Sequence, residues 1–257
     1  MHVNHQYLLD FCERQRKTRA QGSFTVLDYG CGKGETVIAG RARGLEIFGA
    51  EAFYEGGDRR ADAQASGLLG SAIREIHDGR LDFPDNFFDV VVSNQVLEHV
   101  PDLEAVLDEI DRVLKPGGVT LHLFPSRDVM REGHCGIPFI HWFPKTARLR
   151  RPYMLALRRL GMGKFKANKP PEKFVDTFLP WLDRFTFYRK RSDILRSFRK
   201  HFSAELIEDD IICFRLAASG RGSLVPLARV PLFKPLAKEA FRRLAGLAVL
   251  AKKQERT

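Results

Sequence analysis

The feature that most constrains this chain is a short apolar segment that leads directly into a glycine-rich loop. Residues 23–28 (SFTVLD) predict a strand, and Gly30, Gly32 and Gly34 then occupy every second position. Glycine tolerates positive φ and lets a ligand approach the backbone closely. A helix predicted over residues 34–43 would add free N–H groups that favour a carboxylate or a phosphate. The pattern therefore predicts a ligand site at the carboxyl end of the first strand of an open α/β sheet.

Two common phosphate-binding motifs do not fit this loop. A dinucleotide fingerprint has the spacing Gly-x-Gly-x-x-Gly, and here Glu35 takes the place of its third glycine. A P-loop would need Gly-Lys-Ser/Thr, which is absent. Taken alone, the loop is also compatible with a structural tight turn, so the surrounding residues have to decide its role.

Acidic residues follow two further predicted strands. Glu51 comes after residues 45–50, where its carboxylate would accept hydrogen bonds from a ribose diol. Asp78 comes after residues 71–77, where it would meet an adenine amino group. Taken alone, each of these acids is more simply explained as a helix cap or as a solvated loop residue. Together with Asp28, however, they suit a ligand that carries a ribose, an adenine and a positive centre.

Strand and helix signals alternate through the first half of the chain. A helix is predicted over residues 4–17 and strands over residues 87–93 and 119–124. The strongest helix signal lies between these two strands, with Pro101 at its first position. Such alternation predicts a parallel sheet with right-handed crossovers, and hence a doubly wound, Rossmann-like α/β fold in which residues 1–125 form the ligand-binding core.

The regular pattern stops after residue 125. Residues 126–190 hold many aromatic, proline and basic residues without a clear period, which predicts an inserted cap or lid. Residues 191–257 are predicted to complete the sheet. Within them we expect, in order, a helix over residues 191–202, strand-like sequence over 203–216, a basic amphipathic helix over 232–244 and a last strand over 245–251.

Four stretches, VLDYGCGKGE, GAE, HDGRLDFPDNFFDVVVSNQVLEHV and VLKPGG, resemble in this order the successive motifs of class I S-adenosylmethionine (SAM)-dependent methyltransferases. The resemblance covers about residues 20–125 and, more weakly, the C-terminal strands. It implies a mostly parallel seven-stranded sheet with helices on both faces and SAM as the cofactor. The aromatic and basic cap predicted from residues 126–190 would then be inserted after strand five. The sequence departs from the family at Asp82, where proline is usual, and at Glu51, where aspartate is commoner.

The resemblance also implies which residues contact SAM. They follow four predicted strands, whose carboxyl ends meet at one edge of a parallel sheet. The set is Asp28, Gly30, Cys31, Gly32 and Gly34 at the methionine end, Glu51 at the ribose, Asp78 and Gly79 at the adenine, and Asn94 and Gln95 beside the sulfonium and its methyl group.

The sulfonium of SAM carries its own leaving group, so methyl transfer is mainly a matter of positioning, and no metal is expected. If the acceptor is a hydroxyl, a general base helps, and His134 and His141 in the cap are the predicted catalytic residues. The alternative for both is loop packing against Trp142. His99 is predicted to be structural. The spacing of His134, Cys135 and His141 matches no familiar metal site.

Charge is unevenly distributed along the chain, whose net charge is +10. Residues 141–200 hold 17 Lys/Arg and 4 Asp/Glu, whereas residues 1–140 hold 15 and 22. A basic segment attracts an anionic partner, although a solvated surface without a partner is as common. We expect the acceptor to be recognised by aromatic and basic cap residues, namely Phe139, Trp142, Phe143, Tyr153, Lys145, Arg148, Arg150 and Arg151.

Three functions remain open from the sequence. The aromatic cap favours a methyltransferase for a small-molecule, lipid or glycan acceptor, which could be anionic. The basic segment favours an RNA methyltransferase, but no base-stacking motif and no Asn/Asp-Pro-Pro-Tyr tetrapeptide after residue 93 supports it. A non-catalytic binding module would keep the fold, but the intact loop and acids argue against loss of the cofactor site.

Residues 232–244 would either pack on the sheet, which we favour, or lie on an anionic membrane. No apolar run is long enough to span a bilayer, and the first ten residues lack the features of a signal peptide, so a cytoplasmic protein is expected. The four cysteines form no Cys-x-x-Cys pair, which predicts reduced thiols. The sequence predicts no oligomeric state.

Overall fold

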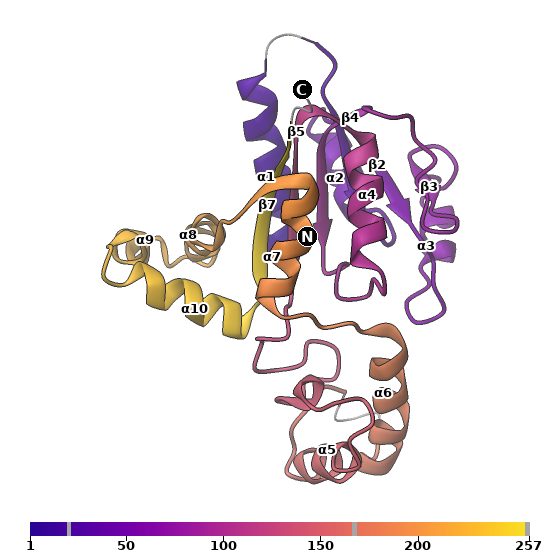
Figure 1. The fold of residues 1–257 in the computed structure, drawn as a ribbon, viewed down its shortest axis with the longest axis vertical. Coiled ribbons are helices and arrows are strands. Elements are labelled where there is room, and N and C mark those ends of the chain that lie inside the picture. Colours follow the sequence, from indigo (N-terminus) through magenta and orange to yellow (C-terminus); the bar gives the residue numbers. More distant parts are fainter. Residues whose placement is uncertain (20–21, 166–168, 255–257) are drawn as a thin grey trace.

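The computed structural model, which describes residues 1–19, 22–165 and 169–254, contains a seven-stranded sheet with helices on both faces and a helical cap at one end (Figure 1). The strand order is β3-β2-β1-β4-β5-β7-β6. Strands β1 to β5 pair in parallel, and β7 is antiparallel to both of its neighbours. The predicted doubly wound, mostly parallel seven-stranded α/β fold is confirmed.

The first four strands lie close to their predicted positions, whereas the fifth begins at Leu114, five residues before its predicted start. The strands are β1 (Thr25–Tyr29), β2 (Glu46–Glu51), β3 (Ile73–Glu75), β4 (Phe88–Asn94), β5 (Leu114–Phe124), β6 (Phe202–Leu206) and β7 (Leu247–Lys253). The central strands β1 and β4 are buried along almost their whole length, as expected for continuous apolar segments covered on both faces.

Helices connect these strands and form the cap. They are α1 (Val3–Thr18), α2 (Glu35–Ala42), α3 (Arg60–Ala65), α4 (Leu103–Val113), α5 (Arg150–Arg159), α6 (Pro171–Phe185), α7 (Arg191–His201), α8 (Glu208–Ala218), α9 (Val225–Arg229) and α10 (Lys234–Leu244), with short 3-10 helices η1 (Ile140–Trp142) and η2 (Gly222–Leu224). Among the described residues, no helix combines the length and the apolar character that crossing a membrane requires.

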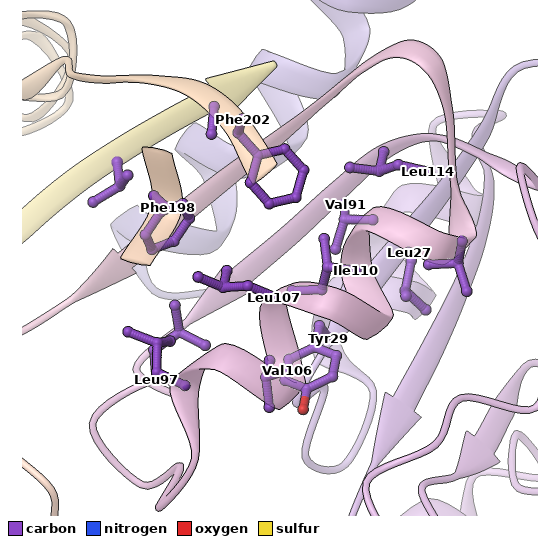
Figure 2. Close-up of a cluster of buried hydrophobic side chains, with 14 of the residues drawn as sticks. Leu27, Tyr29, Val91, Leu97, Val106, Leu107, Ile110, Leu114, Phe198 and Phe202 are labelled. Atoms are coloured by element: carbon purple, nitrogen blue, oxygen red, sulfur yellow. The ribbon is translucent and has the colours of Figure 1, made fainter. Parts of the chain in front are cut away.

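Two apolar clusters hold helices against the two faces of the sheet. On one face, Leu107 and Ile110 of α4 lie against Val91 of β4, and Phe198 of α7 packs in the same cluster (Figure 2). On the other face, α1 buries Tyr7 in a second cluster. Each such side chain contributes roughly 1.5–3 kcal/mol to stability when it is fully buried. The clusters therefore fix the strand ends, where the cofactor residues are predicted.

The strongest predicted helix begins two residues later than expected. The carboxylate of Asp102 accepts a hydrogen bond from the N–H of Ala105 at 3.1 Å and so caps α4. Pro101, predicted as the first helical residue, precedes this cap. An aspartate side chain satisfies a free N–H group at the helix start, and proline has no acceptor on its side chain, so the cap decides where the helix begins.

The strand-like sequence over residues 203–216 forms a strand only at its start. β6 ends at Leu206, and α8 begins at Glu208. Three consecutive acidic residues, Glu208 to Asp210, stand in the first turn of α8. Negative charge at this position stabilises the N-terminal end of a helix, which explains why the following apolar residues continue as helix.

The segment 126–190, which shows no clear period in the sequence, contains two helices. α5 and α6 pack around a core of their own, formed by Cys135, Ile137, Ile140, Met154, Phe174, Val175 and Leu182. In α6, Phe174, Phe178 and Leu182 recur every four residues, so a helical period is present and Pro180 obscures it. Figure 1 shows this cap beyond the carboxyl end of β5.

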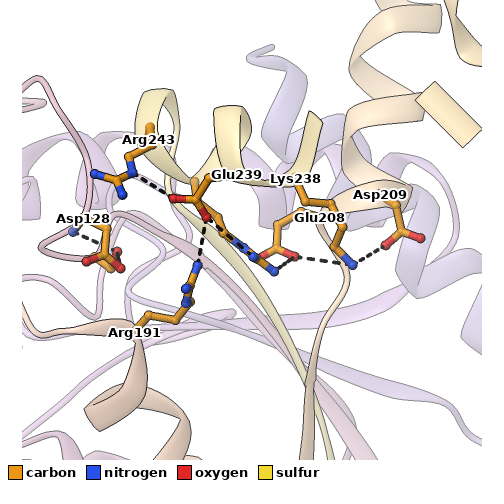
Figure 3. Close-up of polar contacts among 9 residues, drawn as sticks. Asp128, Arg191, Glu208, Asp209, Lys238, Glu239 and Arg243 are labelled. Atoms are coloured by element: carbon orange, nitrogen blue, oxygen red, sulfur yellow. Dashed lines mark hydrogen bonds and ion pairs between the residues drawn. The ribbon is translucent and has the colours of Figure 1, made fainter. Parts of the chain in front are cut away.

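α10 packs against α8, and its apolar face covers the sheet only in part, because Phe241 packs against the second cluster while other apolar residues of the helix do not. Ion pairs join the two helices, among them Lys238 with Asp209 at 3.3 Å (Figure 3). No residue of α10 is buried. Leu236 is 68% exposed and Leu244 is 77% exposed. Because the basic face of α10 meets the acidic start of α8, Leu236 and Leu244 remain in contact with solvent.

Candidate cofactor and acceptor site

The glycine loop between β1 and α2 adopts a left-handed backbone at all three predicted positions. Gly30, Gly32 and Gly34 have φ of 72°, 57° and 86°. A Cβ atom on Gly30 would come within 2.4 Å of Val96, whereas one on Gly32 would meet nothing within 4 Å. Packing therefore demands glycine at Gly30, while Gly32 leaves open space over the loop into which a ligand can fit.

Cys31 contributes to this loop through its backbone. Its side chain packs on β2, because a Cβ atom on Gly49 would lie 2.6 Å from the Cys31 sulfur. Burial raises the pKa of the Cys31 thiol. A buried thiol of this kind is chemically inert, so its role is packing.

Asp28 lies directly before the loop, in the middle of the sheet. It is buried in β1 between Gly49 of β2 and Val92 of β4. Burial raises the pKa of Asp28 to about 7, and a hydrogen bond from Thr36 opposes that rise. Burial favours the neutral form of a carboxyl group, and a nearby cation favours the charged form. A cationic ligand group at the loop would therefore stabilise the Asp28 carboxylate.

Glu51, at the end of β2, reaches across to the glycine loop. Its Oε2 accepts a hydrogen bond from the N–H of Gly32 at 2.6 Å, and its Oε1 accepts one from Ala52 at 3.0 Å. Each carboxylate oxygen keeps a second lone pair, which a ribose hydroxyl could use. The structure thus brings Glu51 and the loop together.

Asp78 and Gly79 form an exposed turn beyond β3, with φ of 50° and 77°. β3 runs parallel to β2, and the N–H of Ile76 donates to the carbonyl oxygen of Glu51 at 2.9 Å. The turn consequently lies at the same carboxyl edge of the sheet as Glu51 and the glycine loop.

Asn94 and Gln95 lie where β4 ends. Gln95 has a left-handed backbone, with φ of 59°. The side-chain oxygen of Asn94 accepts a hydrogen bond from the amide of Asn4 at 2.7 Å, and Asn4 is buried in α1. The sequence did not point to Asn4, because nothing in the first helix signals a contact ninety positions away.

A second polar group lies under the cap, and we call Glu98, His99, Glu132 and His134 the histidine cluster. Glu98 and His99 follow β4, whereas Glu132 and His134 belong to the cap. The Nε2 atoms of His99 and His134 are 3.1 Å apart. The sequence interpretation of His99 as a structural residue missed this pairing, which joins side chains from two segments.

Hydrogen bonds fix the other side of both imidazole rings. Nδ1 of His99 lies 2.7 Å from the carbonyl oxygen of Phe185 in the cap. Nδ1 of His134 lies 2.7 Å from Oε1 of Glu132. Burial lowers the pKa of His99 to about 4. Both rings are therefore held with their Nε2 atoms turned toward each other.

The two carboxylates of the cluster have different surroundings. Glu132 accepts hydrogen bonds from two backbone N–H groups and from the hydroxyl of Tyr188 at 2.6 Å. Although its burial acts in the opposite direction, these bonds and His134 hold the pKa of Glu132 well below its usual range. Burial raises the pKa of Glu98 to about 8. Neither Glu98 oxygen has a hydrogen-bond partner among the described residues.

Aromatic side chains of α6 and of the loop after β2 surround this cluster. Trp181 donates from Nε1 to the carbonyl oxygen of Gly56 at 3.0 Å, and its ring centre lies 4.9 Å from that of His134. Tyr54, from the same loop, packs on the ring of His99. The short loop that follows β2 thus contacts the cap beside the histidine cluster.

His141, the second predicted catalytic residue, is half-buried in the cap. Its ring centre lies 4.6 Å from that of Tyr188, whose hydroxyl donates to Glu132. Burial lowers the pKa of His141. The structure therefore connects His141 to the histidine cluster through Tyr188 and places His134 inside it.

Several basic residues predicted to recognise the acceptor are tied into the cap. Arg150 is buried and pairs with Asp183 at 2.5 Å. Lys145 donates to two backbone carbonyl oxygens. Arg151 pairs with Asp176 at 3.0 Å. These three cations hold the elements of the cap together, so the sequence interpretation overlooked their structural partners.

A family model described as a methyltransferase domain matches residues 2–165. The matched range contains the glycine loop, the acids at the strand ends and the histidine cluster. The chain belongs to this family. Its fold and its motifs place it among the class I SAM-dependent methyltransferases, and SAM is the cofactor.

Curated methyltransferases match part of the chain. It is 32% identical over 123 residues to demethylmenaquinone methyltransferase of Geobacillus stearothermophilus, across 45% of this chain and 51% of that one. It is 33% identical over 111 residues to ubiquinone biosynthesis O-methyltransferase of Pectobacterium atrosepticum, across 42% and 45%. It is 39% identical over 108 residues to sterol 24-C-methyltransferase of Yarrowia lipolytica, across 40% and 28%. The chain spans about half the length of these relatives, or less.

Among solved structures, an S-adenosylmethionine dependent methyltransferase from Mesorhizobium loti is similar over almost the whole length. The TM-score is 0.52, with 19% identity, and the alignment covers 95% of this chain and 100% of that one. At this identity the likeness concerns the fold.

Proposed function

We propose that this chain transfers the methyl group of SAM to a small-molecule acceptor of the lipid or glycan type, which reacts beside the histidine cluster. The observation that carries the proposal is the loop over residues 52–57. It begins next to Glu51, which contacts the glycine loop, and it ends under Trp181, which packs on His134. The names of matched relatives refer to demethylmenaquinone, to ubiquinone biosynthesis and to a sterol. Demethylmenaquinone, ubiquinone and sterols are small molecules.

The residues at the strand ends fit the parts of SAM. When bound, SAM supplies a methyl group on a sulfonium, which leaves as a neutral thioether. We assign the cationic amino acid end to Asp28 and to the N–H groups around Gly32, and the ribose diol to Glu51. The remaining proposed contacts are Gly30, Cys31 and Gly34 in the loop, Asp78 and Gly79 at the adenine, and Asn94 and Gln95 near the methyl group.

The reaction then needs an acceptor held in line with the methyl carbon. A hydroxyl oxygen would form the new bond to carbon, the carbon–sulfur bond would break with its electron pair going to sulfur, and the hydroxyl proton would leave at the histidine cluster. The His134 side chain is 26% exposed and is the most open member of the cluster. We assign His134 to the acceptor side and His141 to the support of Tyr188 behind it.

We also propose that α9 and α10 rest on an anionic membrane, at a cytoplasmic location, where a lipid-like acceptor would reside. Exposed apolar side chains of these two helices and of the connection between them are Leu227, Leu232, Phe233, Leu236 and Leu244. Basic side chains of the same segment are Arg229 and three that also pair with acids of the chain, namely Lys234 with Asp209, Arg242 with Glu208 and Arg243 with Glu239. Apolar residues flanked by cations bind a membrane surface through buried area and attraction to anionic headgroups.

The internal use of basic residues weakens the RNA methyltransferase alternative. Arg150 is paired inside the cap, Arg158 is buried and donates to backbone carbonyl oxygens that include that of Lys164, and Arg189 donates to three carbonyl oxygens after β4. RNA binding depends on cations that can neutralise phosphates. Part of the charge excess in residues 141–200 is therefore used to hold the fold together.

A labelling experiment tests the proposed function. The purified chain is incubated with methyl-tritiated SAM and either a lipid extract or total RNA from the source organism. We expect label in the lipid fraction, and at least a tenfold loss of that label in His134→Ala. Label in RNA alone would replace the proposal with the RNA alternative. Titration of both proteins with S-adenosylhomocysteine, expected to be equal, checks that the variant keeps its cofactor site.

A further inference from the structure

The hydrogen bonds around the histidine cluster determine which ring nitrogens carry protons. A carbonyl oxygen can only accept, so Nδ1 of His99, 2.7 Å from the oxygen of Phe185, carries a proton. Glu132 is a carboxylate that accepts from several donors, so Nδ1 of His134, 2.7 Å from it, carries a proton as well. A neutral imidazole protonated at Nδ1 has a lone pair at Nε2.

Two lone pairs therefore face each other at the 3.1 Å contact between the Nε2 atoms of His99 and His134. Two acceptors at this distance repel unless a positive species lies between or beside them. The Glu98 carboxyl group supplies a third acceptor, with Oε1 at 3.9 Å from Nε2 of His99. The Glu98 side chain is fully buried, and neither oxygen has a hydrogen-bond partner among the described residues. A buried carboxyl group without a partner is costly in either protonation state.

We propose that Glu98, His99 and His134 bind a divalent transition-metal ion, with Zn²⁺ as the reference ion. One ligand atom from each residue lies within 4.8 Å of the other two. Two ligands at about 2.0–2.1 Å from a tetrahedral zinc ion are about 3.3–3.4 Å apart. The Nε2 pair at 3.1 Å is close to that separation. Glu98 lies 3.9 Å from Nε2 of His99, and the three ligand atoms lie within 4.8 Å of one another, so its carboxyl group has to move inward by roughly 1 Å to complete the site.

The surroundings of Glu98, His99 and His134 resemble those of a catalytic metal site. Two histidines and a glutamate leave one position of a tetrahedral ion open, as in catalytic zinc sites. The carboxylate of Glu132 holds the ring of His134, and a backbone carbonyl holds that of His99, which is the usual support for metal-bound imidazoles. Imidazole and carboxylate together suit zinc, iron or manganese better than calcium.

This inference rests on the proposed function for its chemistry. An acceptor hydroxyl in the open position would lose its proton to water near neutral pH, as water bound to zinc does. Its oxygen would then form the bond to the methyl carbon, while the carbon–sulfur bond breaks and the electron pair moves to sulfur. No electron is exchanged with the ion. The sequence prediction that no metal binds was based on Cys135 and His141 as possible ligands beside His134. In the structure, the residues beside His134 are Glu98 and His99.

The experiment uses the untagged chain after dialysis against a chelator. Co²⁺ is added, because its visible absorption reports the coordination geometry, and Zn²⁺ is measured by calorimetric titration. We expect one ion per chain and a tetrahedral cobalt spectrum. His134→Ala and Glu98→Gln should each bind at least a hundredfold more weakly. His201→Ala, which removes a histidine of α7 paired with Glu104 and Asp108, is the control and should bind normally.

Folding and cofactor binding are measured on the same samples by circular dichroism and by titration with S-adenosylhomocysteine. No stoichiometric metal binding by a folded chain would overturn the inference and leave a proton shared between the two imidazoles. Binding that is unchanged in His134→Ala and Glu98→Gln would overturn it too. If the chain binds S-adenosylhomocysteine but no metal, the methyltransferase proposal stands without this site. If it binds metal but no S-adenosylhomocysteine, the proposed function fails separately.

Discussion

At the scale of single residues, the proposed cofactor site depends on Glu51. Glu51→Ala should weaken S-adenosylhomocysteine binding about tenfold or more, since each tenfold change corresponds to about 1.4 kcal/mol and a charged hydrogen bond is worth about that much. The residue also anchors the N–H of Gly32, so the loop loses a partner. Calorimetric titration measures the change. Glu46→Ala, at the exposed start of the same strand, is the control, and equal affinity of the two variants would remove Glu51 from the site.

The raised pKa of Asp28 leads to a prediction about pH. In the protein without ligand, Asp28 binds a proton below its pKa of about 7, whereas an unfolded aspartate has lost that proton above about 4. The cationic end of SAM prefers the carboxylate. Affinity for SAM should therefore rise as the pH increases from 6 to 7.5, because Asp28 loses its proton over this range.

Asp28→Asn provides the comparison. It should bind SAM more weakly than the original chain and show a flat pH dependence, because the amide does not titrate. Titrations at four pH values in buffers of matched ionisation enthalpy measure both curves. A parallel rise in the two proteins would assign the pH dependence to another group.

The positions of the proposed cofactor residues at one edge of the sheet could be predicted from sequence, because these residues follow strands in a fixed order. The histidine cluster could not. His99 and His134 are 35 positions apart, and only the packing of the cap against the loop after β2 brings them together. The absence of a hydrogen-bond partner for Glu98 is likewise a property of the folded environment.

At the scale of helices and strands, the sequence pattern predicted an element correctly where no other residue in the segment obscured that pattern. The core strands were predicted within a few residues because both of their faces are buried. The first turn of α8 carries three acids, a helix signal that the β-branched residues around it obscured. In the cap, Pro180 obscured the four-residue spacing of α6, and the basic residues that suggested a partner are those that pair with Asp183 and Asp176.

The exposed face of α10 supports a prediction at this scale. The wild-type chain should sediment with vesicles that contain anionic phosphatidylglycerol and much less with neutral phosphatidylcholine vesicles. The double variant Leu236→Asp/Leu244→Asp should lose at least tenfold in partitioning, because it places charge on the apolar face and removes buried area. Leu160→Asp, at an equally exposed leucine of the cap, is the control. Equal loss in both variants would mean that α10 is not the contact surface.

At the scale of the whole molecule, the cap has its own apolar core but is joined to the sheet by hydrogen bonds to backbone carbonyl oxygens. The N–H of Phe187 donates to the carbonyl oxygen of Glu98 at 2.7 Å. Arg189 donates to the carbonyl oxygens of Val100 and Pro101 at 2.7 and 2.8 Å. These bonds connect the end of the cap with the segment that follows β4, on which the histidine cluster is built. Cap and sheet should therefore unfold as one cooperative unit.

Calorimetric unfolding tests this coupling. The wild-type chain should show one transition, which S-adenosylhomocysteine at a hundred times its Kd stabilises by about 2.7 kcal/mol, or by about 5–10 °C for a protein of this size. Arg189→Ala leaves the carbonyl oxygens of Leu97, Val100 and Pro101 without this donor. The cap should then unfold first, in a separate transition that the ligand does not shift. Arg196→Ala, which breaks only an exposed ion pair of α7, should keep one transition. A single transition in Arg189→Ala would show that apolar packing of α6 against the loop after β2 couples the cap to the sheet. Two transitions in the wild-type chain would mean that cap and sheet are not coupled.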